Sequence, residues 1–309
     1  MSCALPRIPI VFLVGPTAVG KTAVAIELAC QMNGEVVSCD AMQVYREAMI
    51  TTDRPSQDML KGVPHHVMGI VSVEEEFNVA LYREVALKAI KDILARQKTP
   101  IICGGSGMYM MALLDGLLEG GAPDAEVRRH LEAEADKLGL KVLYRRLQEV
   151  DPQAAEKITS ADRVRIVRAL EVFESTGVPI SMLQKTREGL WGRYHIRIFC
   201  LNREREELYA RAEARIDQMF ALGLEGEVKA LLKHALTPTS SRIIGIPELR
   251  DYFSGVRSLG EAKELMKRNT RHYIKRQLTW FRKDKRLEWI NAAPDASVVG
   301  VVEDIRRLM

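Results

Sequence analysis

The chain has 309 residues, of which 47% are hydrophobic and 28% charged, and its formal net charge is +4. This length predicts one large domain carrying an insertion, or two domains. The composition is typical of a soluble globular protein, and the apolar runs are too short to span a membrane. The N-terminal sequence lacks the pattern of a signal or transit peptide. We therefore expect a cytoplasmic protein that does not engage a membrane.

The cysteines form no metal-binding or disulfide pattern. There is no C-x-x-C pair and no Cys/His spacing of a zinc site. A scattered, odd-numbered set in a cytoplasmic chain indicates reduced thiols. The five residues are Cys3, Cys30, Cys39, Cys103 and Cys200.

The first structured segment contains a phosphate-binding pattern. Residues 15–22, hereafter the phosphate loop, match G-x-x-x-x-G-K-[ST] at every fixed position, between an expected strand at 8–14 and an expected helix at 23–31. The glycines let backbone N–H groups point at a phosphate, Lys21 adds positive charge, and the Thr22 hydroxyl can hold Mg²⁺. The pattern predicts a diphosphate or triphosphate site without naming the compound. Its residues are Gly15, Pro16, Thr17, Ala18, Val19, Gly20, Lys21 and Thr22.

The next elements predict a parallel α/β sheet. The expected helix closes near Gly34, residues 35–38 form a short strand that leads to Asp40, and residues 77–97 form a long amphipathic helix. A buried strand at 99–103 then runs into a glycine-rich turn that contains Ser106. Ligands gather at the carboxyl ends of parallel strands. Asp40 and Ser106 are therefore expected near the phosphate loop.

From about residue 116 the pattern changes to helices alone, at 126–138, 142–150, 153–158 and 162–175. An alternating strand at 194–201 returns the chain to the sheet. Helices at 205–222, 224–234 and 263–282 follow, and residues 287–290 predict a last strand. The predicted fold is a P-loop NTPase-like parallel sheet flanked by helices, with an all-helical insertion domain. Residues 1–115 and 195–309 form the core, and residues 116–194 form the insertion.

Asp40 occupies an unusual position for a carboxylate, at the end of an expected strand beside the phosphate loop. Three roles are open. It can cap the following turn, which is a common structural use of Asp. It can bind Mg²⁺, or it can act as a general base toward an acceptor nucleophile.

Two arginines in the helix at 205–222 are candidates for gripping phosphate. Arg211 and Arg215 are spaced i and i+4, so they share a helix face, and a guanidinium binds phosphate in a bidentate manner. Glu207 and Glu213 offer an ordinary alternative, because i,i+4 ion pairs on helix surfaces are common. The sequence alone leaves both interpretations open.

The segment 263–286 carries ten Lys or Arg residues against two acids, interleaved with His272, Tyr273, Trp280 and Phe281. Such a basic segment is typical of a nucleic-acid surface, with aromatic rings available to stack on unpaired bases. A solvated helix face is the alternative, but the excess of positive charge is larger than solubility requires. Arg163, Arg165 and Arg168 of the insertion extend the same pattern.

Together these motifs resemble one family, the tRNA dimethylallyltransferases, also called tRNA isopentenylpyrophosphate transferases. An ordered set covering nearly the whole chain is far more specific than a phosphate loop alone. The matching segments are 15–22, 38–45, 104–109, 112–116, 165–173, 211–219, 223, 227–228, 244–245 and 270–282.

The resemblance implies transfer of the dimethylallyl group from dimethylallyl diphosphate to N6 of the adenosine at tRNA position 37, 3′ of the anticodon, with release of diphosphate. It implies that the phosphate loop and Arg215 hold the diphosphate, with Mg²⁺ as cofactor on Thr22, and that Asp40 takes the proton from N6. Asp40, Thr22 and Arg215 would be catalytic, and the chain is expected to be a monomer. Contacts to the tRNA anticodon stem-loop would come from Asp40, Ala41, Met42, Gln43, Val164, Arg165, Ile166, Val167, Arg168, Arg242, Lys275, Arg276, Gln277, Trp280 and Arg282.

The chain departs from the family pattern at three places. Ala41 stands where the family usually has Ser, and residues 49–55 read Met-Ile-Thr-Thr-Asp-Arg-Pro where the family has Asp-Ile-Gly-Thr-Ala-Lys-Pro. Ile246 replaces the Tyr of a Gly-Tyr pair. The phosphate loop, Asp40, Gln43 and Arg215 are intact, so the activity is expected to survive.

Three other functions compete with this one. A small-molecule kinase would use the phosphate loop equally well, but it leaves the basic helix and the insertion arginines without a role. A nucleotide switch or a non-catalytic RNA-binding module has no need of Asp40 beside the loop. An adenylate isopentenyltransferase acts on a free nucleotide, which does not require the basic helix.

Overall fold

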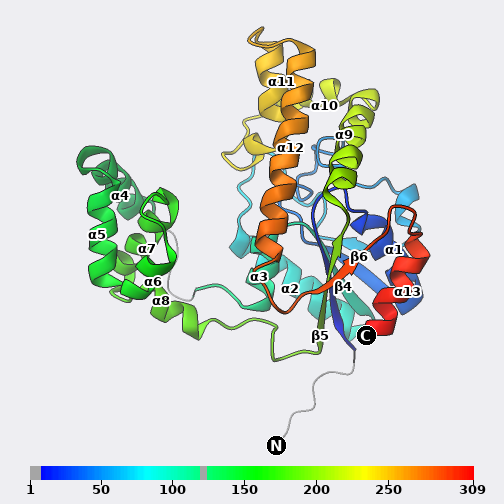
Figure 1. Cartoon of the computed structure of the whole chain (residues 1–309), viewed down its shortest axis with the longest axis horizontal. Helices are drawn as coiled ribbons and strands as arrows, with labels where there is room; N and C mark the ends of the chain where they lie inside the picture. The colour runs from blue at the N-terminus through cyan, green and yellow to red at the C-terminus, as the bar shows by residue number, and fades with distance from the viewer. Residues whose placement is uncertain (1–7, 119–123) are drawn as a thin grey trace, which may run out of the picture. The chain divides into compact units, whose positions relative to one another are not determined.

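A six-stranded parallel sheet forms the centre of the computed structural model, which describes residues 8–118 and 124–309. The strand order is β3-β2-β4-β1-β5-β6 (Figure 1). All pairings are parallel, as predicted, and the α/β fold class is confirmed. The strands are β1 (Ile10–Val14), β2 (Gly34–Ser38), β3 (His65–His66), β4 (Thr99–Gly104), β5 (Ile196–Asn202) and β6 (Glu288–Asn291).

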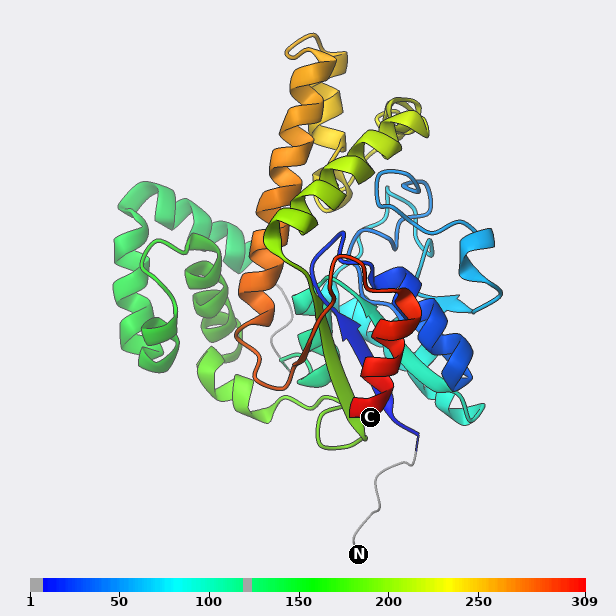
Figure 2. The same cartoon turned by 45° about the vertical axis from the view of Figure 1, so that its right-hand side comes forward.

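The central strand β1 is buried along its whole length, which explains its continuous apolar sequence. Helices α1 (Lys21–Met32) and α13 (Val298–Leu308) contact each other, as Figure 2 shows, and share one core cluster with residues of β1. Helix α2 (Val79–Ala95) contacts β2 and β4. Asn78 caps α2 by accepting hydrogen bonds from two backbone N–H groups, so the helix begins two residues later than predicted.

A helical extension rises beyond the sheet, as Figures 1 and 2 show. Strand β5 leads into α9 (Arg205–Ala221), and α10 (Leu224–Leu231), α11 (Ile246–Phe253) and α12 (Leu259–Phe281) follow. Helix α12 is a single helix of 23 residues. It begins four residues before the predicted start because Ser258 and Glu261 form a capping box.

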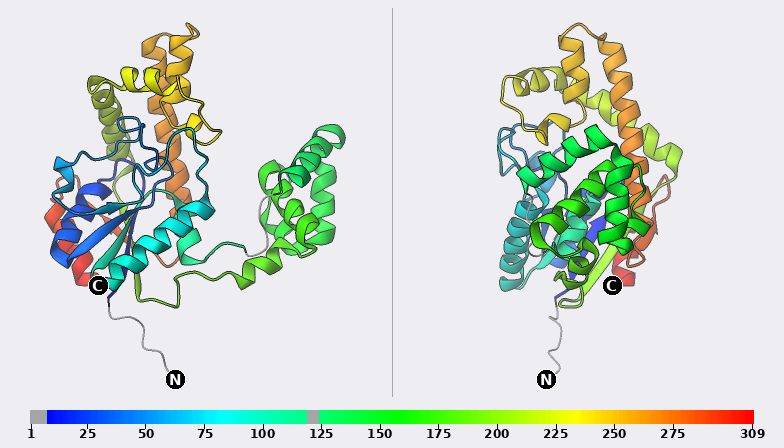
Figure 3. Two further views of the ribbon diagram at one scale, coloured as in Figure 1. Left: turned by 180° about the vertical axis from the view of Figure 1, so that it is seen from behind. Right: turned by 90° about the vertical axis from the view of Figure 1, so that its left-hand side faces the viewer.

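Residues Leu114–Gly189 form a second compact unit, and the chain up to Leu113 together with Leu190–Met309 forms the first. The described part of this second unit contains helices and no strand, and Figure 3 shows it from two further sides. Leu131, Leu147 and Leu170 are fully buried in its own core. Its helices are α4 (Ala125–Leu138), α5 (Leu140–Val150), α6 (Pro152–Lys157), α7 (Arg163–Thr176) and α8 (Ile180–Leu183).

Several short elements have no clear sequence signal and were not predicted. Strand β3 has only two residues, and α3 (Gly107–Leu114) is apolar on every side, so it lacks the periodicity of an amphipathic helix. Helices α11 and α13 were also missed. Helix α1 ends near Gly34 as predicted, with Asn33 closing it at φ 49° and Gly34 opening β2. No helix within the described ranges is long and apolar enough to cross a membrane.

A buried carboxylate fastens the edge of the sheet. Glu35 of β2 is 1% exposed and accepts hydrogen bonds from Arg96, Lys98 and His66. The Arg96 guanidinium, followed by Lys98 and His66, holds the pKa of Glu35 well below its usual value of 4.5, although burial opposes this shift. The charged carboxylate therefore stabilises the fold above pH 4.5, and this contribution is lost as the pH falls below that value.

Replacing Glu35 with Gln is expected to lower the free energy of unfolding by about 3 kcal/mol at neutral pH, because Arg96 and Lys98 lose their buried charged partner and His66 loses an acceptor. The difference from wild type should shrink as the pH falls below 4.5, where Glu35 of the unfolded chain takes up a proton. Urea unfolding at several pH values measures both effects. Glu303→Gln, on the exposed face of α13, is the control, and equal losses in the two variants would contradict the prediction.

Candidate functional site

The phosphate loop joins the carboxyl end of β1 to α1. Gly15 has φ 146° and Gly20 has φ 102°, values that favour glycine, and a Cβ on Gly15 would lie 2.5 Å from the Leu201 carbonyl oxygen of β5. The Lys21 Nζ donates to the carbonyl oxygens of Gly15 at 3.0 Å and Pro16 at 2.7 Å. Burial lowers the pKa of Lys21, while the charge of Asp40 raises it. The loop thus has the shape and charge of an anion site.

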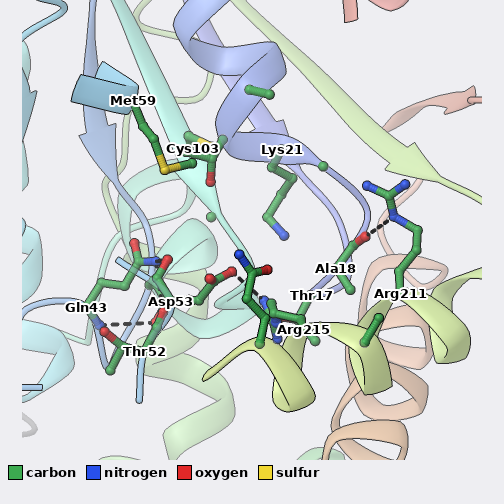
Figure 4. Close-up of a pocket in the computed structure, with 17 residues that line it drawn as sticks. Thr17, Ala18, Lys21, Gln43, Thr52, Asp53, Met59, Cys103, Arg211 and Arg215 are labelled. Atoms are coloured by element: carbon green, nitrogen blue, oxygen red, sulfur yellow. Dashed lines mark hydrogen bonds and ion pairs between the residues drawn. The ribbon is translucent and has the colours of Figure 1, made fainter. Parts of the chain in front are cut away.

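A cavity of about 450 Å³ opens on the phosphate loop. It brings Thr17, Lys21 and Thr22 together with Asp40 after β2 and Arg215 of α9. Figure 4 labels Thr17 and Lys21 of the loop and Arg215 of α9 among the side chains that line the cavity, with Asp53 bonded to Arg215. The structure therefore gathers residues from distant parts of the sequence around one anion site.

Arginines of α9 and of the turn before it are fastened to the phosphate loop. They are spaced eight and four residues apart, multiples of four that bring side chains to the same side of the helix and of the turn before it. Two of the guanidinium groups hold carbonyl oxygens of the loop, and the third holds the Thr17 hydroxyl. Sequence reasoning singled out Arg211 and Arg215 and missed Arg203, although the same spacing leads back to it. The contacts are Arg203 Nε to Val19 O at 3.2 Å, Arg211 Nε to Ala18 O at 2.9 Å and Arg215 Nη2 to Thr17 Oγ1 at 2.7 Å.

Gln277 of α12 supports the phosphate loop from within the protein. Its Oε1 accepts from the Thr17 N–H at 2.8 Å, and its Nε2 donates to the Gly105 carbonyl oxygen at 2.9 Å. The residue is 5% exposed. Both ends of its amide thus hold loops of the protein itself, and the expected contact of Gln277 with tRNA stays a prediction.

Asp40 fills the first of the three roles left open by the sequence, because it caps the turn that follows it. Its Oδ1 accepts from the N–H groups of Met42 at 2.9 Å and Gln43 at 3.3 Å, so it does stabilise the turn. Its side chain also lines the phosphate cavity and a second cavity of about 230 Å³. The two cavities share Thr17, Asp40, Thr52, Asp53 and Arg215. Asp40 thus stands where the two spaces meet.

Apolar and aromatic side chains form much of the wall of the second cavity. Ile216, Met219 and Ile243 form part of its wall, and Tyr273 and Arg276 of α12 form another part. Gln43, on the phosphate side of the junction, donates its Nε2 to the carbonyl oxygens of Thr52 and Asp53, as the dashed lines of Figure 4 mark. This fixes the orientation of its amide at the point where the cavities meet.

One carboxylate holds the loop 49–53 that closes the site. Glu227 of α10 accepts from the backbone N–H groups of Met49, Ile50 and Thr51 and from the Thr51 hydroxyl. This places Asp53 Oδ2 2.9 Å from Arg215 Nη1. Sequence reasoning noted Glu227 and the unusual loop but assigned neither a role, because nothing in the sequence connects them.

Some of the other residues that are expected to contact tRNA are exposed, and some are buried. Lys275, Arg276 and Arg282 are exposed on α12, Trp280 is 38% exposed, and Arg242 is exposed at the rim of the second cavity. In the helical unit, Val164 is 79% exposed and Arg165 is exposed, whereas Arg168 is half-buried beside Glu171. The side chains of Ile166 and Val167 belong to the core of that unit, and the expected contacts of these two residues with tRNA stay a prediction.

The oxygen atoms of the site suit Mg²⁺. Thr22 and Asp40 line the same cavity, and a hydroxyl and a carboxylate are hard oxygen ligands of the kind that Mg²⁺ takes together with phosphate oxygens and water. Within residues 8–118 and 124–309, no three acidic, His or Cys side chains gather as a complete cage. The residues therefore fit an ion that is held mainly through a phosphate ligand.

Comparisons with known proteins agree with this site. The family model described as IPP transferase matches residues 43–284. The chain belongs to this family. A tRNA dimethylallyltransferase 2 of Geotalea uraniireducens is 43% identical over 92% of both chains, and a tRNA dimethylallyltransferase of Pelotomaculum thermopropionicum is 39% identical over 99% of this chain and 98% of its own.

Two solved structures resemble the whole chain. The tRNA isopentenylpyrophosphate transferase of Bacillus halodurans is 35% identical, with a TM-score of 0.69, over 98% of this chain and 99% of its own. A eukaryotic dimethylallyltransferase, crystallised acting on tRNA, is 27% identical, with a TM-score of 0.84, over 97% of this chain and 78% of its own. The IPP transferase model matches residues 43–284 and so does not include the phosphate loop. The alignment with the Pelotomaculum thermopropionicum relative covers 99% of the chain and includes this loop.

In this IPP transferase family member, Gln277→Leu is expected to lower the free energy of unfolding by about 2 kcal/mol, because the Thr17 N–H and the Gly105 carbonyl lose their partner. Urea unfolding measures the loss. Thr279→Ala on the exposed side of the same helix is the control, with an expected change within about 0.5 kcal/mol. A stable Gln277→Leu variant would show that the amide does not hold the two loops.

Proposed function

We propose that this chain is a tRNA dimethylallyltransferase, which transfers the dimethylallyl group from dimethylallyl diphosphate to N6 of the adenosine at tRNA position 37 and releases diphosphate. The observation that carries the proposal is the position of Asp40 at the junction of an anion cavity and a second, partly apolar cavity. Two reactants entering from the two sides would meet at its carboxylate. We further propose that the enzyme works as a cytoplasmic monomer.

The donor diphosphate would lie in the phosphate loop. Breaking the allylic C–O bond places growing negative charge on the leaving diphosphate, and Lys21, Arg215 and the N–H groups of the loop stabilise that charge. Arg215 is already held against Thr17, so little rearrangement of the guanidinium is needed when charge develops. Mg²⁺ held by the Thr22 hydroxyl would add a further positive charge beside the diphosphate.

The acceptor adenine would enter through the second cavity. Asp40 then takes the proton that N6 loses when the new C–N bond forms. Gln43 has a fixed amide whose Nε2 is already engaged, so its carbonyl oxygen is the end that can accept from an exocyclic amine. An aromatic amine is a weak nucleophile, so in-line positioning contributes more than early deprotonation.

The RNA would be held by charges on α12 and next to it, at the rim of the second cavity and beyond it. The target base is stacked in the anticodon loop and has to be extruded to reach Asp40. Lys275, Arg276 and Arg282 on α12 supply phosphate contacts, and Trp280 supplies a ring for stacking. Val164 and Arg165 at the start of α7 present a second exposed surface of the helical unit.

A direct assay separates this function from its rivals. The protein is incubated with labelled dimethylallyl diphosphate and unmodified tRNA, with labelled donor and free adenosine monophosphate, and with ATP and a set of small-molecule acceptors. Label in the tRNA alone supports the proposal. Label in the nucleotide supports an adenylate isopentenyltransferase, and ATP turnover without prenyl transfer supports a kinase.

Asp40→Asn is expected to reduce the transfer rate by about 100-fold or more, because the amide keeps the turn but cannot accept the N6 proton. tRNA affinity should be unchanged. Single-turnover transfer and filter binding measure the two quantities. Asp40→Ala removes both functions and is expected to lose transfer as well. Normal turnover with weakened tRNA binding would leave Asp40 with a structural role only.

Arg282→Ala is expected to weaken tRNA binding. It should also reduce the slope of log K against log salt concentration by about one, the share of a single phosphate contact. Donor binding should not change, because Arg282 does not line either cavity. Titrations of tRNA at several salt concentrations provide the slope. Arg307→Ala on α13, with a side chain 73% exposed, is the control, and equal slopes for the two variants would contradict a phosphate contact at Arg282.

A further inference from the structure

Asp53 lies against the arginine that the proposed reaction uses. Its Oδ2 is 2.9 Å from Arg215 Nη1, while Arg215 Nη2 donates to the Thr17 hydroxyl of the phosphate loop at 2.7 Å. Asp53 and Arg215 both line the phosphate cavity. A carboxylate therefore faces the same guanidinium that the donor diphosphate would need. At this position the family pattern that the sequence resembles has Ala rather than an acid.

The backbone of Asp53 is held on several sides. Its N–H donates to the Ile50 carbonyl, its own carbonyl accepts from Gln43 Nε2, and Glu227 fixes the preceding residues through their N–H groups. Asp53 has φ 53°, a left-handed conformation that Asp and Asn tolerate better than most residues. The loop thus presents the carboxylate to Arg215, and only the side chain is free to turn away.

The environment of Arg215 points to an exchange of anions. The Arg215 side chain is 23% exposed and its Nε is buried with no hydrogen-bond partner within the described ranges, whereas the Asp53 side chain is 50% exposed. An exposed carboxylate binds a guanidinium weakly, and a diphosphate carries more charge and more acceptor oxygens. Asp53 therefore occupies Arg215 in the absence of donor and is displaced when donor binds.

We propose that Asp53 is a positioning residue that sets donor affinity: it holds the Arg215 guanidinium in place beside Thr17, competes with the donor diphosphate for it, and returns to it when diphosphate leaves. The proposal rests on the assignment of the phosphate loop to the donor. Its consequence is weaker binding of both donor and released diphosphate than the loop would otherwise give, and hence faster release of product.

The test is calorimetric titration of the full chain with inorganic diphosphate, at low salt, with and without Mg²⁺. Asp53→Asn keeps the left-handed backbone but removes the charge, and it is expected to bind diphosphate about fivefold more tightly, with or without Mg²⁺. KM for the donor should fall, and kcat should fall where product release limits turnover. High salt should reduce the difference.

Two controls isolate the contact. Asp217→Asn removes a charge from α9 at a side chain that pairs with Lys263 and Lys267, away from the cavity, and should leave diphosphate affinity unchanged. In an Arg215→Ala background, Asp53→Asn should lose most of its effect, because the two anions no longer share a guanidinium.

The outcomes keep the two proposals apart. The inference is overturned if Asp53→Asn binds diphosphate as tightly as wild type or more weakly. If the variant binds diphosphate more weakly only when Mg²⁺ is present, Asp53 is a metal ligand instead. A wild-type protein that prenylates tRNA leaves the proposed function intact in either case. A wild-type protein that neither binds diphosphate nor prenylates tRNA overturns the proposed function itself.

Discussion

The rest of the structure depends on one constraint: the N–H groups of the turn after β1 have to face an open cavity and still be held in place. A turn that binds anions cannot fold back on its own donors, so its support has to come from outside. Arg203 and Arg211 grip two of its carbonyl oxygens, and Gln277 takes the N–H of Thr17. The helical extension beyond the sheet supplies all three side chains. The helices after β5 therefore hold the shape of a loop encoded near the beginning of the chain.

The same arrangement explains how one site serves two chemically different reactants. A diphosphate requires positive charge and N–H groups, whereas a prenyl chain and a base require apolar and aromatic walls. The structure separates these environments into two cavities and joins them at Asp40. The carboxylate belongs to the turn after β2, and its hydrogen bonds to Met42 and Gln43 fix its position. In the proposed reaction, a carboxylate held in this way would need no conformational change to reach the proton of an entering amine.

Local signals predicted most of the fold but only part of the site. The strands, the long helices and the phosphate loop follow from apolar periodicity and glycine spacing, which are properties of neighbouring residues. The side of a helix that faces inward was harder to predict, and Gln277, Ile166 and Val167 were placed at the RNA although they are buried. The link from Glu227 to residues 49–51 and the pair of Asp53 with Arg215 join segments more than 150 residues apart. Such contacts depend on the packing of α9 and α10 over the sheet, which no local pattern records.

Helix α12 carries both a side chain that holds the loops of the site and basic side chains that face solvent. Gln277 points inward to the loops after β1 and β4, and Lys275, two residues earlier, is exposed to solvent. Neither residue can move without the other, because an α-helix of this length turns and shifts as a unit. Any RNA that displaces α12 on its outer side therefore disturbs both loops on its inner side. If RNA binds α12 as proposed, its binding and the shape of the phosphate cavity are coupled, and linkage requires the influence to be equal in both directions.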